Sequence, residues 1–348
     1  METFWFVAVG LMLAIYVVLD GFVFGAGIIY QFVAKTDVER RLVLNSFGPV
    51  WHGNEVYLIA AGGLLFFAFP KVYAAGFSGF YLALIIVLWL FMLRGVSIKV
   101  RSHLENHLWR TFWDGVFPLA SLLLAIVFGA TLGNLIRGVP LDEDGYFFTA
   151  LWTTWTPGPE PGILDWYTVL MGLVGATILT VHGANYLAVK TEGELCRRAC
   201  RIADVGSWAV VPLTFLAILA IPFVQPALRL NYQANPMGYL VPVVGASALA
   251  AMVYFRQKRR DLPAFWASSL FILALLGSVG WGLYPNLLIA SKDPAYSLTA
   301  FNSATSAYGL RVGLVWFTIG ISLVIIYTVY VYRAFWGKVP AHHLDHGY

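Results

Sequence analysis

Long apolar runs separated by short polar segments dominate the chain. A run of about 20 apolar residues is long enough to cross the hydrocarbon core of a bilayer as a helix. The pattern predicts nine such helices, at residues 4–34, 49–70, 74–98, 113–136, 164–189, 205–227, 238–255, 263–287 and 308–336. Trp and Tyr border several of these runs, as expected for side chains that prefer the membrane interface.

The connecting segments on the two sides of the predicted membrane carry unequal numbers of Lys and Arg residues. Of the 22 Lys and Arg residues, five fall on one side of the predicted membrane: Lys71, Arg137, Arg229, Lys292 and Arg311. The other side holds the remaining basic residues, and cytoplasmic loops characteristically carry that excess. We therefore expect the N-terminus outside, the C-terminus inside, and an odd number of spans.

These elements predict an all-α polytopic membrane protein with a single transmembrane domain over residues 1–348. We expect two four-helix bundles, 1–137 and 165–287, plus one extra helix. Residues 138–164 form an acidic outer loop rich in Pro and Gly, and 288–348 hold a further outer loop, the last helix and a cytoplasmic tail.

Composition supports a membrane protein and excludes several functions. Hydrophobic residues make up 59% of the chain and charged residues 11%, against about 25% charged in a typical soluble domain. The net charge of +4 resides where anionic lipid headgroups lie, so we expect no nucleic-acid partner. The chain also lacks a P-loop, a G-x-S-x-G elbow and an H-E-x-x-H motif, which argues against nucleotide or hydrolytic chemistry.

The two cysteines, Cys196 and Cys200, fall in a predicted cytoplasmic loop of sequence CRRAC. Disulfides are disfavoured in that compartment. Two thiols supply only half of a zinc coordination shell. We therefore interpret them as ordinary reduced thiols and expect no metal.

Three polar sites lie within the apolar runs. Asp20 precedes Lys35 by 15 residues, roughly 22 Å along a helix, and His52 follows Arg41 by 11 residues, roughly 16 Å. His182, followed closely by Asn185, lies eight residues before Lys190. Ionisable residues at such depth commonly mark ion or proton paths. For His182 we favour the alternative, a hydrogen bond that packs one helix against another.

The segment WHGNE, residues 51–55, carries the strongest signal. Pro49 lacks an N–H group, so a helix arriving from Asp37 must kink or restart there. Beyond the break, His52 and Glu55 are three residues apart and share one helix face. Such a pair could pass a proton. A purely structural pair is the competing interpretation.

Together, LDGFVFGAG, ERRLVLNSFGPVWHGNEVYLIAAGG, FPKVYAAGFSGFYLAL and HGANYLAVKTEGEL resemble subunit II of the cytochrome bd family of quinol oxidases. The resemblance implies nine transmembrane helices in a prokaryotic cytoplasmic membrane. It also implies a homologous partner, subunit I, that carries haems b and d and the quinol site and reduces oxygen to water. A small single-helix subunit could complete the complex.

The resemblance further implies that this chain binds no haem, stabilises its partner and offers a proton route. Some members also hold a structural quinone. We take four residues of this chain as proton-path candidates and five others as candidates for a polar cluster or for packing; of these, Asp20, Glu55, Arg94 and Asp114 align with polar positions of the family. The proton-path candidates are Asp20, His52, Glu55 and Asp114. The polar-cluster and packing candidates are Trp51, Asn54, Arg94, His182 and Asn185.

Three positions depart from the family pattern, which commonly has acids where this chain has Val23, His52 and Lys99. We therefore expect an altered or inactive proton path. We also expect His52, Glu55 and Asp20 to form a buried cluster in which Glu55 matters most for assembly. Two other functions stay open: a secondary transporter, and a bd-like complex that does not reduce oxygen.

Overall fold

The computed structural model describes residues 1–339, and the regular structure among them is almost entirely helical. The helices are α1 (Glu2–Leu19), α2 (Gly21–Val33), α3 (Asp37–Phe47), α4 (Trp51–Ala68), α5 (Pro70–Gly79), α6 (Tyr81–Val100), α7 (His107–Arg137), α8 (Trp166–Lys190), α9 (Gly193–Val224), α10 (Leu228–Ala234), α11 (Leu240–Gln257), α12 (Asp261–Leu283) and α13 (Ala307–Ala334). Two short strands, β1 (Asn286–Leu288) and β2 (Leu298–Thr299), form an antiparallel pair.

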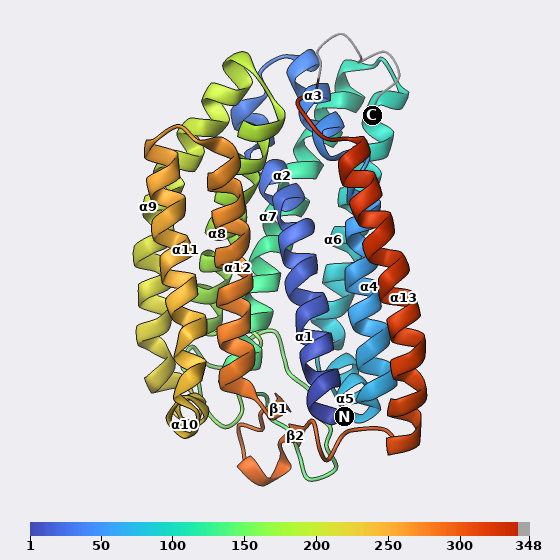
Figure 1. The fold of residues 1–348 in the computed structure, drawn as a ribbon, viewed down its shortest axis with the longest axis vertical. Helices are drawn as coiled ribbons and strands as arrows, with labels where there is room; N and C mark the ends of the chain where they lie inside the picture. Colours follow the sequence, from blue (N-terminus) through green and yellow to red (C-terminus); the bar gives the residue numbers. More distant parts are fainter. Residues whose placement is uncertain (340–348) are drawn as a thin grey trace.

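Within the described residues, eight helical segments are long and apolar enough to cross a membrane, and α4 with α5 brings the number to nine. The prediction of nine spans agrees with the upper count. In Figure 1, α1 begins at the lower end and α13 finishes at the upper end, as an odd number of crossings requires.

The α4–α5 pair bends by 119° at Phe69. Pro70 occupies the first turn of α5, and a residue before proline is driven out of helical geometry. The expected span at 74–98 is therefore wrong at its beginning. Its first residues belong to α5, and the spanning helix α6 begins at Tyr81.

The segment CRRAC also differs from its prediction as a loop. It lies in the first two turns of α9, which begins at Gly193. The predicted span began only at residue 205, because the first turns of α9 are charged. Glu194, Arg197 and Arg198 extend the helix beyond the apolar run.

Figure 1 shows two groups of helices. Helices α8, α9, α11 and α12 lie on one side, α4, α6 and α13 on the other, and α1, α2 and α7 between them.

Glycines allow α2 and α8 to approach closely, because a Cβ at Gly25 would overlap the Leu179 carbonyl and the Gly183 backbone. The last helix is peripheral, with Leu310 its one buried residue.

The lower end in Figure 1 carries β1, β2, α10 and the acidic loop 138–164. No helix or strand interrupts this described loop. Its two ends are fixed by an ion pair between Arg137, at the end of α7, and Asp165, which caps the start of α8.

Candidate functional site

A break in the first span organises the polar residues around it. The helix stops at Leu19 and restarts at Gly21, which frees the carbonyls of two residues. His182 Nε2 lies 2.9 Å from the Val18 oxygen, and Asn54 Nδ2 donates to the Leu19 oxygen at 2.7 Å. An unpaired carbonyl in hydrocarbon costs several kcal/mol. Two helices thus supply the hydrogen bonds that the break removes.

At the same break lies the Arg94 cluster, which consists of Arg94, Asp20, Tyr16 and Glu55. Arg94 donates two parallel hydrogen bonds to the Asp20 carboxylate, at 2.7 and 2.8 Å. Tyr16 donates a third bond to Asp20 at 3.0 Å. Arg94 and Asp20 are both fully buried. Bidentate, charge-assisted bonds of this kind are the strongest that a carboxylate can accept.

Aromatic rings enclose the guanidinium of Arg94. Its central carbon lies 4.4 Å from the centre of the Phe24 ring and 5.9 Å from those of Trp51 and Phe91. A cation above aromatic faces is attracted by their negative charge distribution. Trp51 thus packs against the Arg94 cluster.

Glu55 holds the least constrained carboxylate of the cluster. It lies 3.7 Å from Arg94, its side chain is 29% exposed, and it makes no hydrogen bond to any described residue. Arg94 is already neutralised by Asp20, so an ionised Glu55 leaves the cluster with one net negative charge. Within the Arg94 cluster, Glu55 is the group best able to accept a proton.

A second group, the Arg101 cluster, consists of Arg101, Asp114, Tyr30, Arg40 and Asp37. Buried Asp114 accepts hydrogen bonds from Arg101 Nε at 2.5 Å, Arg40 at 2.7 Å and Tyr30 at 2.7 Å. Arg101 also donates to Asp37 at 2.8 Å. Asp114 therefore belongs to this cluster and has no direct bond to Asp20 or Glu55 among the described residues.

Arginines surround Asp37 at the exposed edge of the Arg101 cluster. Arg41 lies 3.1 Å from its carboxylate and Arg110 3.5 Å. Partial burial acts to raise the pKa of Asp37, but the bond to Arg101 and the neighbouring positive charges outweigh burial and lower it. With four arginines and two aspartates in contact, this region carries a positive surplus.

His52 does not join the buried cluster, so that expectation is wrong. Its side chain is exposed in the isolated chain and packs against the Trp51 ring, with centroids 3.7 Å apart. Within the described residues, no hydrogen bond or ion pair joins His52 to Glu55 or Asp20.

Two further candidates on α8, His182 and Asn185, differ in their contacts. Both ring nitrogens of His182 are engaged, since Nδ1 lies 2.7 Å from the Ser268 hydroxyl. His182 thus ties α8 to α1 and α12. Asn185 is fully buried, and its amide finds no partner among the described residues.

Sequence reasoning missed several members of both clusters: Tyr16, Tyr30, Arg40, Asp37 and Arg101. Arg101 was interpreted only as one of the basic residues that follow a span. A usable signal was its spacing of seven residues from Arg94, which places both on one face of a helix.

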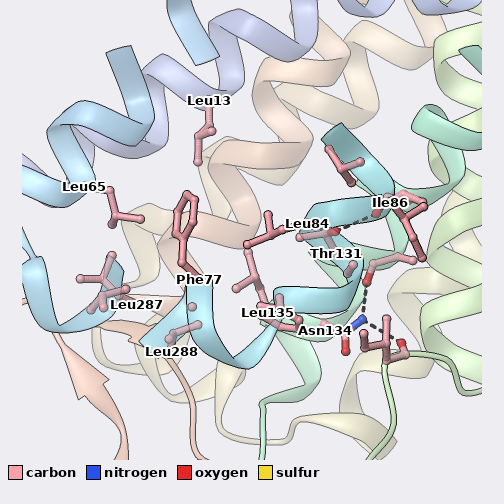
Figure 2. A pocket seen from close by; sticks show the side chains of 18 of the residues that line it. Leu13, Leu65, Phe77, Leu84, Ile86, Thr131, Asn134, Leu135, Leu287 and Leu288 are labelled. Carbon is pink, nitrogen blue, oxygen red and sulfur yellow. Dashed lines mark hydrogen bonds between the residues drawn. The ribbon is translucent and has the colours of Figure 1, made fainter. Parts of the chain in front are cut away.

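An apolar cavity of about 470 Å³ lies away from both clusters, between α1, α5, α6 and α7 (Figure 2). Leu13, Phe77, Leu84 and Leu287 line it, and Asn134 lies at one end. The Asn134 amide is already bonded to two carbonyls. The cavity therefore suits an apolar chain better than a polar group.

Comparison with known proteins agrees with this architecture. The family described as "Cytochrome bd terminal oxidase subunit II" matches residues 1–335. The cytochrome bd-I ubiquinol oxidase subunit 2 of Escherichia coli K12 is 30% identical, over 98% of this chain and 96% of its own. The cytochrome bd ubiquinol oxidase subunit 2 of Bacillus subtilis is 30% identical over 88% of each chain.

Structural comparison gives the same fold. The structure of bd oxidase from Geobacillus thermodenitrificans has a chain that superposes with a TM-score of 0.76, covering 96% of this chain and 98% of its own at 19% identity. This chain belongs to the cytochrome bd terminal oxidase subunit II family. It is a multi-pass protein of the bacterial cytoplasmic membrane.

Proposed function

We propose that this chain is the haem-free subunit II of a quinol-oxidising terminal oxidase. In this proposal subunit I carries haems b and d and reduces oxygen to water, and this chain stabilises it. The family match over residues 1–335 supports this function most directly. The predicted orientation, with the N-terminus outside, is part of the same proposal.

The proposal includes an altered or inactive proton path. A proton path needs groups that accept and release protons within hydrogen-bond reach or through one water. Glu55 satisfies the first requirement, but His52 lies outside its cluster and Asp114 is held by two arginines. Val23, where the family commonly has an acid, is buried and cannot carry a proton. The cluster residues therefore serve mainly to hold helices together.

We also propose that the cavity in Figure 2 holds the isoprenoid chain of a structural quinone. The apolar lining of the cavity fits the isoprenoid chain, whereas the bonded amide of Asn134 offers the quinone ring no free donor. Gly76 faces open space, so Gly76→Leu should fill the cavity and reduce co-purified quinone. Gly62→Leu, also beside open space but outside the cavity, is the matched control.

Purification from native membranes tests the central proposal. A tagged chain should co-purify with a haem-bearing partner, and the pair should consume oxygen with quinol. Recovery of the chain alone and without haem would favour a secondary transporter. A haem-bearing pair that oxidises quinol without consuming oxygen would favour a bd-like complex of different chemistry.

A further inference from the structure

Two cysteines and an aspartate meet where α9 and α12 begin. Cys196 and Cys200 are one helical turn apart on α9, and their sulfur atoms lie 3.9 Å from each other. Asp261, the first residue of α12, has Oδ1 3.8 Å from the Cys200 sulfur. All three side chains are half-buried, and one ligand atom of each lies within 4.8 Å of the others.

These separations match those of ligands around a tetrahedral metal ion. With zinc–sulfur bonds of about 2.3 Å, two sulfurs at the tetrahedral angle are about 3.8 Å apart. With a zinc–oxygen bond of about 2.1 Å, sulfur and oxygen are about 3.6 Å apart. The measured 3.9 and 3.8 Å thus require little movement to accept an ion.

We propose that Cys196, Cys200 and Asp261 form a binding site for a soft divalent cation such as Zn²⁺, with water as the fourth ligand. Thiolate ligands select such ions over Mg²⁺ or Ca²⁺. The Cys200 thiol donates to Asp261 in the metal-free site, and the ion takes the place of that proton. Binding releases both thiol protons to solvent.

Arg256 at the end of α11 positions the carboxylate. It is buried, and it donates to Asp261 Oδ1 at 2.7 Å and to Asp204 at 2.9 Å. Hydrogen bonds from outside the coordination shell orient metal ligands in this way. The charges also balance. Two thiolates and two carboxylates give −4, while Arg256, Arg259, which pairs with Asp204, and Zn²⁺ give +4.

A bound ion would cross-link α9 to α12, with α11 held through Arg256. These helices adjoin one another along the edge of the molecule farthest from α13 in Figure 1. Our proposed orientation exposes this end to the cytoplasm, where both thiols stay reduced. A site for a metal is therefore favoured over a disulfide.

The purified complex, loaded with Zn²⁺ and then passed through a column with a competing chelator, tests the site. We expect one zinc per chain, with X-ray absorption showing two sulfurs at about 2.3 Å. The double variant Cys196→Ser, Cys200→Ser should lose this zinc. Asp142→Asn, at the opposite end of the molecule, should retain it.

The sequence after Val339 contains three histidines, His342, His343 and His346, which could also bind zinc. A chain ending at Val339 should keep the zinc and its two sulfurs. Zinc that disappears with the tail, or that persists in the double cysteine variant, would overturn the proposal.

A measurement on the unaltered complex avoids any effect of substitution on folding. Zn²⁺ at about ten times its dissociation constant should slow maleimide alkylation of Cys196 and Cys200 roughly tenfold, by mass action. The same concentration of Mg²⁺ should leave the rate unchanged. Alkylation that proceeds equally fast with Zn²⁺ would show that the thiols do not hold the ion.

Discussion

Arg94, on α6, and Arg101, the residue directly after α6, lie seven residues apart on one helical face and about 10 Å apart along the helix axis. Both are buried and both hold an aspartate through two hydrogen bonds. Their surroundings differ. Among residues 1–339, Arg94 is the one cationic partner of Asp20, whereas Asp114 has both Arg101 and Arg40.

The charge balance differs in sign as well. Glu55 gives the Arg94 cluster one carboxylate more than it has cations. The Arg101 cluster has equal numbers of arginines and aspartates, and Arg41 and Arg110, which also contact Asp37, add a positive surplus around it. A carboxylate that has no cation of its own in the membrane is open to protonation, whereas arginine neighbours favour the charged form of a carboxylate. An Arg–Asp ion pair thus lies beside a protonatable carboxylate, Glu55, in the Arg94 cluster, whereas in the Arg101 cluster it is surrounded by further arginines.

Of the substitutions that distinguish the two clusters by their effects, Arg94→Ala should have the largest. It leaves the Asp20 charge buried without a cation, which typically costs about 3–5 kcal/mol. We expect little haem-bearing complex to be recovered from membranes. The yield of complex, determined from its haem absorbance per gram of membrane, measures this effect.

The double variant Asp20→Asn, Arg94→Gln is the matched control for that loss. It removes both charges and keeps side chains that can hydrogen-bond, so yield should recover well above that of Arg94→Ala. A double variant as poor as the single one would show that the ion pair itself, and not an uncompensated charge, is required.

Arg101→Ala should cost less, about 1.5–3 kcal/mol, the usual range for hydrogen bonds to charged groups. Asp114 keeps its bonds to Arg40 and Tyr30, so no charge is left without a partner. The complex should assemble with a lowered thermal midpoint. A yield as low as that of Arg94→Ala would contradict the distinction between the clusters.

The membrane spans were predictable, because long apolar runs report directly on the bilayer. The partners of the polar residues within them were not. Asn54 and His182 bond carbonyls freed by a break at Asp20, and no local pattern shows which helix will supply a donor. Shared spacing suggested that His52 and Glu55 act together. Glu55 faces Arg94 instead, while His52 packs on Trp51.

The importance given to Glu55 in assembly also changes with the structure. Asp20, not Glu55, makes the hydrogen bonds to Arg94, so we now assign the larger assembly role to Asp20. Sequence alone could not rank the two carboxylates, because their rank depends on which one reaches the guanidinium.

Acid should weaken the Arg101 cluster through Asp37. Because its pKa is lowered from the usual 3.8, ionised Asp37 stabilises the fold above that value. This contribution is lost as the pH falls through the lowered pKa. Asp37→Asn should therefore lower the thermal midpoint at neutral pH, and the difference from wild type should shrink below about pH 4. A difference that stays constant down to strong acid would indicate that Asp37 acts without its charge.

His52→Ala should have the smallest effect of all. His52 is exposed in the isolated chain and bonds to neither Glu55 nor Asp20, so a proton route through it lacks a link. Quinol oxidase turnover should stay within roughly a factor of three of wild type, a barrier change below about 0.7 kcal/mol. Glu55→Gln, which removes the spare carboxylate of the Arg94 cluster, should stay in the same range if the path is inactive. A collapse of turnover in His52→Ala, with complex and haems intact, would make His52 a working proton relay, and a collapse confined to Glu55→Gln would place an active path through the Arg94 cluster without His52.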